Sequence, residues 1–230
     1  MSTGAAADGP RFGPLYRRSV AEPLATQLIE NLHPRPGMRV VTLLDTGDLV
    51  GGLLRARGAR AVGWDGRSAP PPGDACVSLL SLGFAAPGTV LAAIGRALPP
   101  DGASLHLVLS RRTPPFVEMV FERALRRAGH RSGYLHRLVS EHSVDAALSA
   151  GYEAALITDV ARFDSTAQVW RALVEEGPLG AEASAGGVAA PAMASVRDEV
   201  VAELAMRAAA DGTLLLPITA ALLRSPLLSL

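Results

Sequence analysis

The stretch "RVVTLLDTGDLVGGLLRARGARAVGWD", Arg39 to Asp65, decides the fold of this chain. It opens with an apolar run of strand length, passes through a turn that holds Gly47, and continues in a helical pattern that closes at Gly58. A second apolar run, 60–65, follows directly. Strand, turn, helix and strand within about 30 residues have the size of one βαβ unit, so this stretch predicts a parallel pair of strands.

The rest of the chain continues this alternation. Apolar periodicity predicts further helices over 16–32, 89–98, 114–129, 143–151 and 196–212, and further strands over 75–82, 104–110, 152–163 and 213–223. Strands that alternate with helices predict an α/β fold, in which a mostly parallel sheet carries helices on both faces.

The domain organisation follows from the stretches without periodicity. Residues 1–12 are small and polar, and we expect a flexible N-terminus there, followed by a single domain over 13–230. The small, featureless stretch 177–195 predicts a mobile linker near the end of that domain.

Composition excludes several classes of function. All 22 basic residues are Arg and 22 acidic residues balance them, so no charge excess points to nucleic acid or a membrane surface. The absence of Lys excludes a lysine Schiff base and a Walker phosphate loop. The single cysteine, Cys76, excludes an internal disulfide and a cysteine-rich zinc site, and its apolar surroundings are typical of a core residue.

Targeting signals are also missing from the sequence. No apolar run has the length that spans a bilayer, and the first residues lack the pattern of a signal peptide. We therefore expect a cytoplasmic protein. The bias toward Ala, Arg, Gly and Pro is typical of a GC-rich bacterial genome.

The order of the segments resembles that of the class I S-adenosylmethionine-dependent methyltransferases, above all the small-molecule branch that includes the ubiquinone and menaquinone methyltransferases. "TGDL" (46–49) resembles the end of their glycine-rich first motif, and "AVGWD" (61–65) resembles their second strand with its acidic tip. "IGRALPPDG" (94–102) resembles the turn before their fifth strand. The likeness covers about residues 12–223 and implies a Rossmann-like methyltransferase sheet that binds S-adenosylmethionine.

The first motif departs from the family pattern. The family's "V-L-D-x-G-x-G-x-G" corresponds to a stretch that is one residue shorter, with Thr42 in place of the acid and Leu44-Asp45 in place of the first glycines. Glycines at these positions let the backbone approach the methionine part of the cofactor, and a side chain intrudes there. Asp45 also sets a negative charge near the cofactor's carboxylate unless it turns away. We expect S-adenosylmethionine to bind weakly or not at all.

The segment between the family's second and fourth strands is shorter still. Only nine residues, 66–74, separate Asp65 from the next apolar run, whereas a parallel crossover takes a dozen residues or more. Nine extended residues reach roughly 30 Å, enough to return along a strand of about 17–20 Å. "APPP" at 69–72 favours such an extended path. The sequence therefore predicts a sheet without the family's third strand, and without one wall of the adenine pocket.

The resemblance assigns three candidate cofactor-binding residues, Thr46, Gly47 and Asp65. Asp65 lies 18 positions after Gly47, close to the roughly 20 expected for an acid that bonds a ribose hydroxyl. The alternative interpretation is a polar residue that begins the Asp-Gly turn at the end of a strand.

Candidates for a general base, if the chain is an enzyme, are His136, Glu141 and His142 in "LHRLVSEH" (135–142). His130 also lies nearby, and the histidines are spaced by six residues. That spacing does not place a pair on one helix face, so the sequence predicts no metal site.

Three hypotheses of different classes result. The chain is a degenerate, non-catalytic partner or scaffold subunit of an active methyltransferase or larger assembly; or it is an active S-adenosylmethionine-dependent small-molecule methyltransferase with a rebuilt pocket; or it catalyses another reaction, such as a cyclisation, on the same scaffold. Because two independent changes fall on the same cofactor pocket, we favour the first hypothesis. Fold analogy does not separate the three.

The predicted partner surface is the strand 60–65. Without a third strand it becomes a sheet edge, on which Val62 and Trp64 share one face because side chains alternate. We expect an obligate oligomer, with an active homologue or with itself, that contacts Val62 to Trp64 or the link 66–74, since Trp is a frequent interface anchor. The alternative is that the linker 177–195 or the N-terminal arm covers this edge within one chain.

Overall fold

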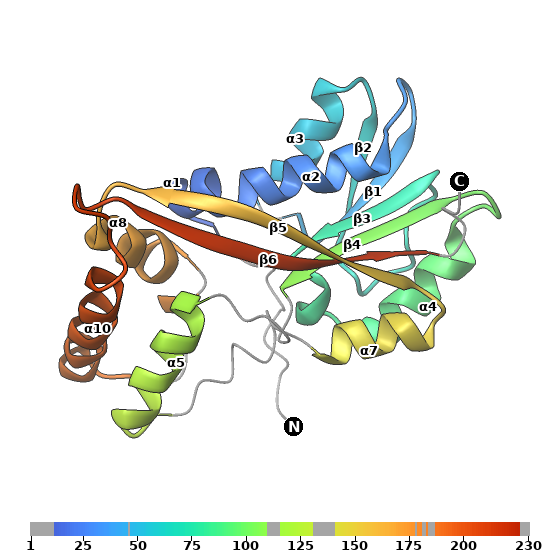
Figure 1. The fold of residues 1–230 in the computed structure, drawn as a ribbon. Helices are drawn as coiled ribbons and strands as arrows, with labels where there is room; N and C mark the ends of the chain where they lie inside the picture. The colour runs from blue at the N-terminus through green and yellow to red at the C-terminus, as the bar shows by residue number, and fades with distance from the viewer. Residues whose placement is uncertain are drawn as a thin grey trace.

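The computed structural model describes residues 12–45, 47–109, 116–130, 141–177, 179–180, 183 and 187–225. Within these residues six strands form one sheet in the order β2-β1-β3-β4-β6-β5 (Figure 1). The strands are β1 (Arg39–Leu43), β2 (Arg60–Trp64), β3 (Ala75–Leu79), β4 (Ala103–Leu109), β5 (Glu153–Phe163) and β6 (Leu214–Arg224).

The sheet is mostly parallel, as the sequence predicts. β1 pairs in parallel with β2 and β3, and β3 with β4. β6 lies between β4 and β5 and is antiparallel to both. Each strand overlaps a predicted apolar run, and their ends agree to within about one residue except at β3, which ends at Leu79, three residues before the end of its run 75–82. β3 and β4 are buried along their whole length, as expected for strands that are covered on both faces.

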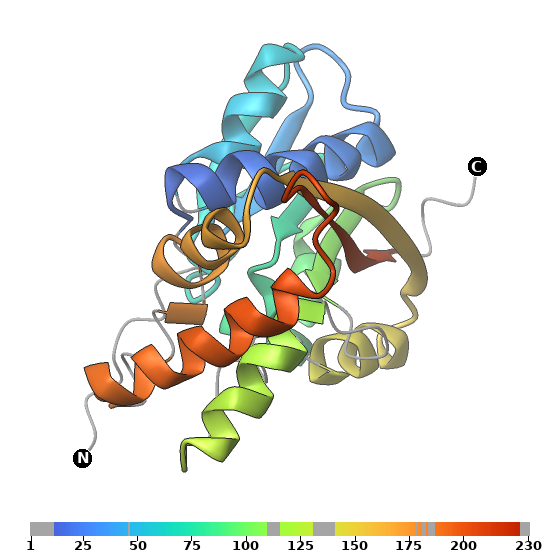
Figure 2. The same cartoon turned by 60° about the vertical axis from the view of Figure 1, so that its left-hand side comes forward.

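Helices cover both faces of the sheet. One face carries α1 (Pro14–Tyr16), the π-helical turn η1 (Arg17–Ala21), α2 (Glu22–Leu32) and α3 (Leu49–Ala56), and the other carries α4 (Pro87–Ala97) and α7 (Glu141–Ser149) (Figures 1 and 2). The two faces correspond to two apolar clusters, one with Leu24 and Leu28 of α2, the other with Leu91 and Ile94 of α4. This α/β arrangement confirms the predicted fold class.

β5 and β6 form a long two-stranded arm. β6 pairs with β4 only through Ala220–Arg224, so its residues 214–219 run on with β5 beyond the carboxyl end of β4. Beneath the end of the arm lie α5 (Phe116–Arg127), α8 (Thr166–Trp170), the π-helical turn η3 (Arg171–Glu175) and α10 (Ala190–Ala205) (Figure 1). α10 packs on α5 and α8. The apolar side chains of the arm and these helices continue the same cluster that contains Leu24 and Leu28 of α2.

Residues 66–74 contain no strand and no helix, and all nine are described. β2 is therefore the outer strand of the described sheet, as predicted for a sheet without the family's third strand. The end of the link is tied to the start of β1, because Asp74 N donates to Arg39 O and Arg39 N donates to Asp74 Oδ2, both at 2.7 Å.

Trp64 is not the exposed interface anchor that the sequence suggests. Its side chain is 5% exposed and belongs to the apolar cluster that includes Leu43 and Val90. The indole N–H donates to the carbonyl oxygen of Ser68 at 3.0 Å, so the chain that follows β2 folds back over it. Val62, on the same strand, is half-buried. The prediction of Trp64 as an anchor is wrong because α4 and the start of the link supply its cover.

The range 177–195, predicted as a linker, is described only in part. Its last residues, 190–195, form the first turns of α10. Two further helical segments, α8 and η3, lie in 166–175, where the sequence analysis predicts no element. Both are five residues long, too short for a helical period to stand out in the sequence.

Candidate functional site

The strand order places a switch point between β1 and β3, since the chain leaves β1 toward β2 and later proceeds from β3 toward β4. In open parallel sheets, ligands bind outside the carboxyl ends of the strands at such a point. The segments that meet there are the turns after β1, β2 and β3. These turns hold the candidate cofactor residues, of which Thr46 lies outside the described residues.

In the turn after β1, two residues other than glycine have backbone angles that normally favour glycine. Leu44 and Asp48 have left-handed φ values of 49° and 55°, and Gly47 between them has a φ of 76°. Such a conformation costs a residue with a Cβ roughly 1–2 kcal/mol. The Leu44 N–H donates to Trp64 O at 2.9 Å, which holds the strained residue against β2. The prediction that Leu44 stands where a glycine would fit agrees with this geometry.

The Asp45 side chain caps the start of helix α3. Its Oδ2 accepts the N–H of Gly51 at 2.7 Å, and its Oδ1 accepts the N–H of Val50 at 3.1 Å. Burial raises the pKa of Asp45, while the hydrogen bond from Gly51 opposes that rise. The first-turn amides of α3 are the groups that bind anions at a helix start. Here the chain's own carboxylate occupies two of them.

Gly47 lies beside the N-terminal helix. Nη1 of Arg17 donates to Gly47 O at 3.3 Å, and Nε of Arg17 pairs with Glu22 at 3.2 Å. Gly47 itself is exposed. The turn after β1 is therefore bridged by η1, which brings the N-terminal helix over the candidate site.

In this structure Asp65 is the polar residue that begins the Asp-Gly turn at the end of β2, which is the alternative interpretation given above. It is exposed at the carboxyl end of β2, and its Oδ1 accepts the N–H of Arg67 at 2.9 Å, the N–H of Ser68 at 3.1 Å and the hydroxyl of Ser68 at 2.9 Å. The hydrogen bond from Arg67, ahead of those from Ser68, lowers the pKa of Asp65. The carboxylate thus organises the Asp-Gly turn, and its role toward a ribose stays a prediction.

The turn after β3 is buried at the switch point. Leu80 is buried with a φ of 55°, and Ser81 donates its hydroxyl to Leu43 O at 2.8 Å. Leu82 is fully buried in η2 (Leu82–Phe84). Leu44 and Leu80, both in the left-handed region, therefore lie directly after β1 and β3, on the two sides of the switch point.

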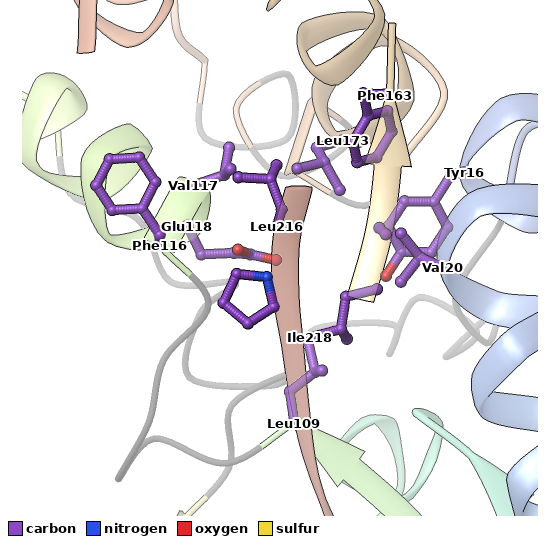
Figure 3. Close-up of a pocket in the computed structure, with 12 residues that line it drawn as sticks. Tyr16, Val20, Leu109, Phe116, Val117, Glu118, Phe163, Leu173, Leu216 and Ile218 are labelled. Atoms are coloured by element: carbon purple, nitrogen blue, oxygen red, sulfur yellow. The ribbon is translucent and has the colours of Figure 1, made fainter. Parts of the chain in front are cut away.

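A pocket opens beyond the carboxyl end of β4, between the N-terminal helix, the first turn of α5 and the arm (Figure 3). The pocket is partly open to solvent, and the empty space within it and its opening together is about 370 Å³. Tyr16 and Val20 form one side, and Leu216 and Ile218 of β6 lie between them and α5 (Figure 3). Because Tyr16 precedes Arg17, one helix connects this pocket to the turn after β1.

Glu118 is the acidic side chain in this apolar pocket. It comes from the first turn of α5 and is 6% exposed. Among the described residues its Oε2 has no hydrogen-bond partner. Burial raises the pKa of Glu118 to about 7, because a charged carboxylate is poorly solvated there. A buried carboxyl group with one oxygen unpaired and a raised pKa is a common mark of a functional site.

Sequence reasoning did not find Glu118, although a signal is present. Phe121 and Leu125 follow it by three and seven residues and are buried, so Glu118 lies on the apolar face of its helix. A glutamate on such a face is unusual. The other walls of the pocket come from distant segments, and the sequence does not show that they meet.

A second buried polar group was also missed, the imidazole of His106 in β4. Its Nδ1 lies 2.8 Å from Ser78 Oγ, its Nε2 lies 2.7 Å from Ser104 Oγ, and Tyr152 donates to Ser104 at 3.0 Å. Burial lowers the pKa of His106 to about 3, so it is a neutral structural link between β3, β4 and β5.

The predicted general-base candidates stay a prediction. His136 lies outside the described residues, Glu141 begins α7, and His142 is exposed on that helix. Within the described part of the chain, no three His, Cys, Asp or Glu side chains gather as metal ligands would. Cys76 is buried in β3, as the sequence predicts, and burial raises its pKa to about 12. None of the helices that the structure describes has the length and apolar character to cross a membrane.

Comparison with known proteins identifies the fold. No protein-family model and no curated protein matches the chain. A protein of Anabaena variabilis, assigned as a methyltransferase of an antibiotic biosynthesis pathway, has a similar structure with a TM-score of 0.60, 12% identity, and coverage of 96% of this chain and 99% of that one.

Two other solved structures are less similar. One is a protein of Galdieria sulphuraria assigned as a sarcosine dimethylglycine methyltransferase, with a TM-score of 0.45, 13% identity and coverage of 96% and 93%. The other is the [4+2]-cyclase SpnF, with a TM-score of 0.43, 18% identity and coverage of 95% and 87%. The fold assignment rests on the Anabaena structure: the chain has the Rossmann-like fold of class I methyltransferases.

Proposed function

We propose that this chain is a non-catalytic protein of the methyltransferase fold, which acts as a partner or scaffold subunit of an active methyltransferase homologue or of a larger assembly. The observation that carries the proposal is the position of Asp45, whose carboxylate occupies the amides of Val50 and Gly51 at the start of α3. We propose that S-adenosylmethionine binds weakly or not at all.

The physical reason is a conflict of charge and space at the turn after β1. In the resembled family this turn approaches the methionine part of the cofactor through glycines. Here Leu44 keeps the left-handed backbone but adds a branched side chain, and Asp45 adds a carboxylate close to the place of the cofactor's own carboxylate. Two like charges held close together without a counterion repel each other.

The second support comes from the link 66–74. It contains no strand or helix, so the elements that carry the adenine wall in the family have no counterpart between β2 and β3. β2 is left as an edge strand with unpaired backbone groups on one side. Proteins usually cover such an edge, and a second chain is one way to do so.

Calorimetric titration with S-adenosylmethionine tests the proposal, and we expect no binding in the micromolar range. Asp45→Asn removes the charge with little change in shape, so it should bind the cofactor more tightly than the natural chain. Asp74→Asn is the matched control, because Asp74 also accepts a backbone N–H, from Arg39 at the opposite end of β1. Micromolar or tighter binding by the natural chain would refute the proposal.

A second candidate function is favoured by the pocket around Glu118. A buried acid beside an apolar pocket suits an enzyme, either an S-adenosylmethionine-dependent methyltransferase with a rebuilt site or a catalyst of another reaction such as a cyclisation. Tight binding of S-adenosylmethionine that Asp65→Ala weakens would support the methyltransferase.

A further inference from the structure

The pocket beyond β4 contains a buried acidic group, and the described residues that line the pocket supply no positive charge to pair with it. Glu118 is 6% exposed, and its Oε2 has no partner among the described residues. None of the described residues that line the pocket is basic. A buried carboxylate without a partner is costly, and a bound group that pairs with it removes that cost.

The walls favour a ligand with an apolar body. Apart from Glu118 the pocket is lined by aliphatic and aromatic side chains, with Tyr16 and Phe163 on the side of the N-terminal helix and the arm (Figure 3). The space between these walls is narrow and partly open to solvent, so the ligand is small. Aromatic rings also attract a cation held near their faces.

We propose that this pocket binds a small apolar molecule that carries one protonated amine, with the Glu118 carboxylate as its ion-pair partner. The ammonium group donates hydrogen bonds to the free carboxylate oxygen, and the apolar body fills the space between α5, β6 and the N-terminal helix. This site goes beyond the partner role proposed above and does not depend on it.

Other charged groups around the pocket do not take the place of the ligand. The elements that line it, α1, η1, β4, α5, β5, η3 and β6, carry the following ionisable residues besides Glu118: Tyr16, Arg17, Arg18, His106, Glu122, Arg123, Arg126, Arg127, Glu153, Asp159, Arg162, Arg171, Glu175 and Arg224. Arg17 pairs with Glu22, Glu122 with Arg126, and Asp159 accepts from Gln27. Arg207 lies 3.6 Å from the ring centroid of Phe116, where it makes a cation–π contact.

Benzylamine and its uncharged counterpart benzyl alcohol are suitable probes, measured by calorimetry or ligand-observed NMR at pH 8. We expect the natural chain to bind benzylamine about tenfold or more tightly than the alcohol, since a hydrogen bond to a charged group contributes that much. Glu118→Gln should abolish this preference. Glu122→Gln, on the same helix and outside the pocket lining, should keep it.

The pH dependence gives a second measurement that needs no variant. Since the pKa of Glu118 lies near 7, the carboxylate forms as pH rises from 6 to 8, and benzylamine stays protonated over that range. Its affinity for the natural chain should therefore rise with pH. An affinity that falls with pH, equal binding of the two probes, or no binding of benzylamine at millimolar concentration would each overturn the proposal. Titration with S-adenosylmethionine reports on the turn after β1, so the two proposals fail independently.

Discussion

At the scale of single residues, Glu118 has a measurable thermodynamic effect on the fold. Its pKa is about 7 in the folded chain, whereas the ordinary pKa of a glutamate side chain, which we expect in the unfolded chain, is 4.5. Between these values the folded chain holds a proton that the unfolded chain releases. This group therefore lowers stability as pH rises from about 4.5 to 7, and its effect is constant above that.

Glu118→Gln should remove this pH dependence. The variant should gain stability relative to the natural chain between pH 5 and pH 8, by at most roughly 3 kcal/mol on the basis of 1.36 kcal/mol per pKa unit. Chemical denaturation at the two pH values measures the difference. Glu122→Gln removes an exposed ion pair with Arg126. The free energy of unfolding of this variant should change with pH in the same way as that of the natural chain. If the free energy of unfolding of Glu118→Gln also changes with pH as that of the natural chain does, folding does not raise the pKa of Glu118.

At the scale of elements, the link 66–74 owes its path to Gly73. A Cβ at Gly73 would lie 2.8 Å from Val41 Cγ2 and 3.1 Å from Arg39 O. Val41 is buried in β1 and cannot move aside easily. Only a residue without a side chain lets the link pass this close to β1, and Asp74 then secures it through its two hydrogen bonds with Arg39.

Gly73→Ala should therefore lower the free energy of unfolding by about 1–3 kcal/mol, the usual cost of overpacking. Gly95→Ala is the matched control, because a Cβ there meets nothing within 4 Å and the position is inside α4. That substitution should raise stability by about 0.5–1 kcal/mol through helix propensity. Urea denaturation of both variants is the measurement, and a neutral Gly73→Ala would mean that the link does not press against β1.

At the scale of the whole molecule, both edges of the described sheet are available to a partner. β2 forms one edge and β5 the other. Val62 on β2 is half-buried, and with Trp64 covered by the chain itself it is the apolar side chain that remains for contact there. On β5, Leu156 is 63% exposed and Val160 is 56% exposed. Apolar side chains on an edge strand favour association.

We predict that the purified chain is oligomeric, or becomes so with an active methyltransferase homologue, and that β2 forms the contact. Light scattering on the natural chain, alone and mixed with the homologue, measures this. Val62→Arg should disrupt the assembly, whereas Leu156→Arg at the opposite edge should not. If only Leu156→Arg disrupts it, the contact lies on β5. A monomer that ignores the homologue would contradict the partner role.

Several features of the molecule could be predicted from the sequence by itself. The six strands overlap the apolar runs at 39–44, 60–65, 75–82, 104–110, 152–163 and 213–223, and their ends agree to within about one residue except at β3, which ends at Leu79. The nine residues 66–74 are too few for another strand and its crossover helices, so the absence of the third strand was also predictable. These features depend on local periodicity, on chain length and on Pro and Gly, all of which are present in the sequence.

Only the tertiary structure decided what the functional side chains do. Trp64 is buried because α4 and Ser68 lie over it, and Asp45 faces α3 because two amides there are free to bind it. Glu118 becomes an unpaired acid in a pocket because segments around residues 16–20, 161–163 and 216–218 meet beside α5. Contacts between segments so far apart leave no periodic pattern in the sequence, since they depend on how the packed elements are placed in space.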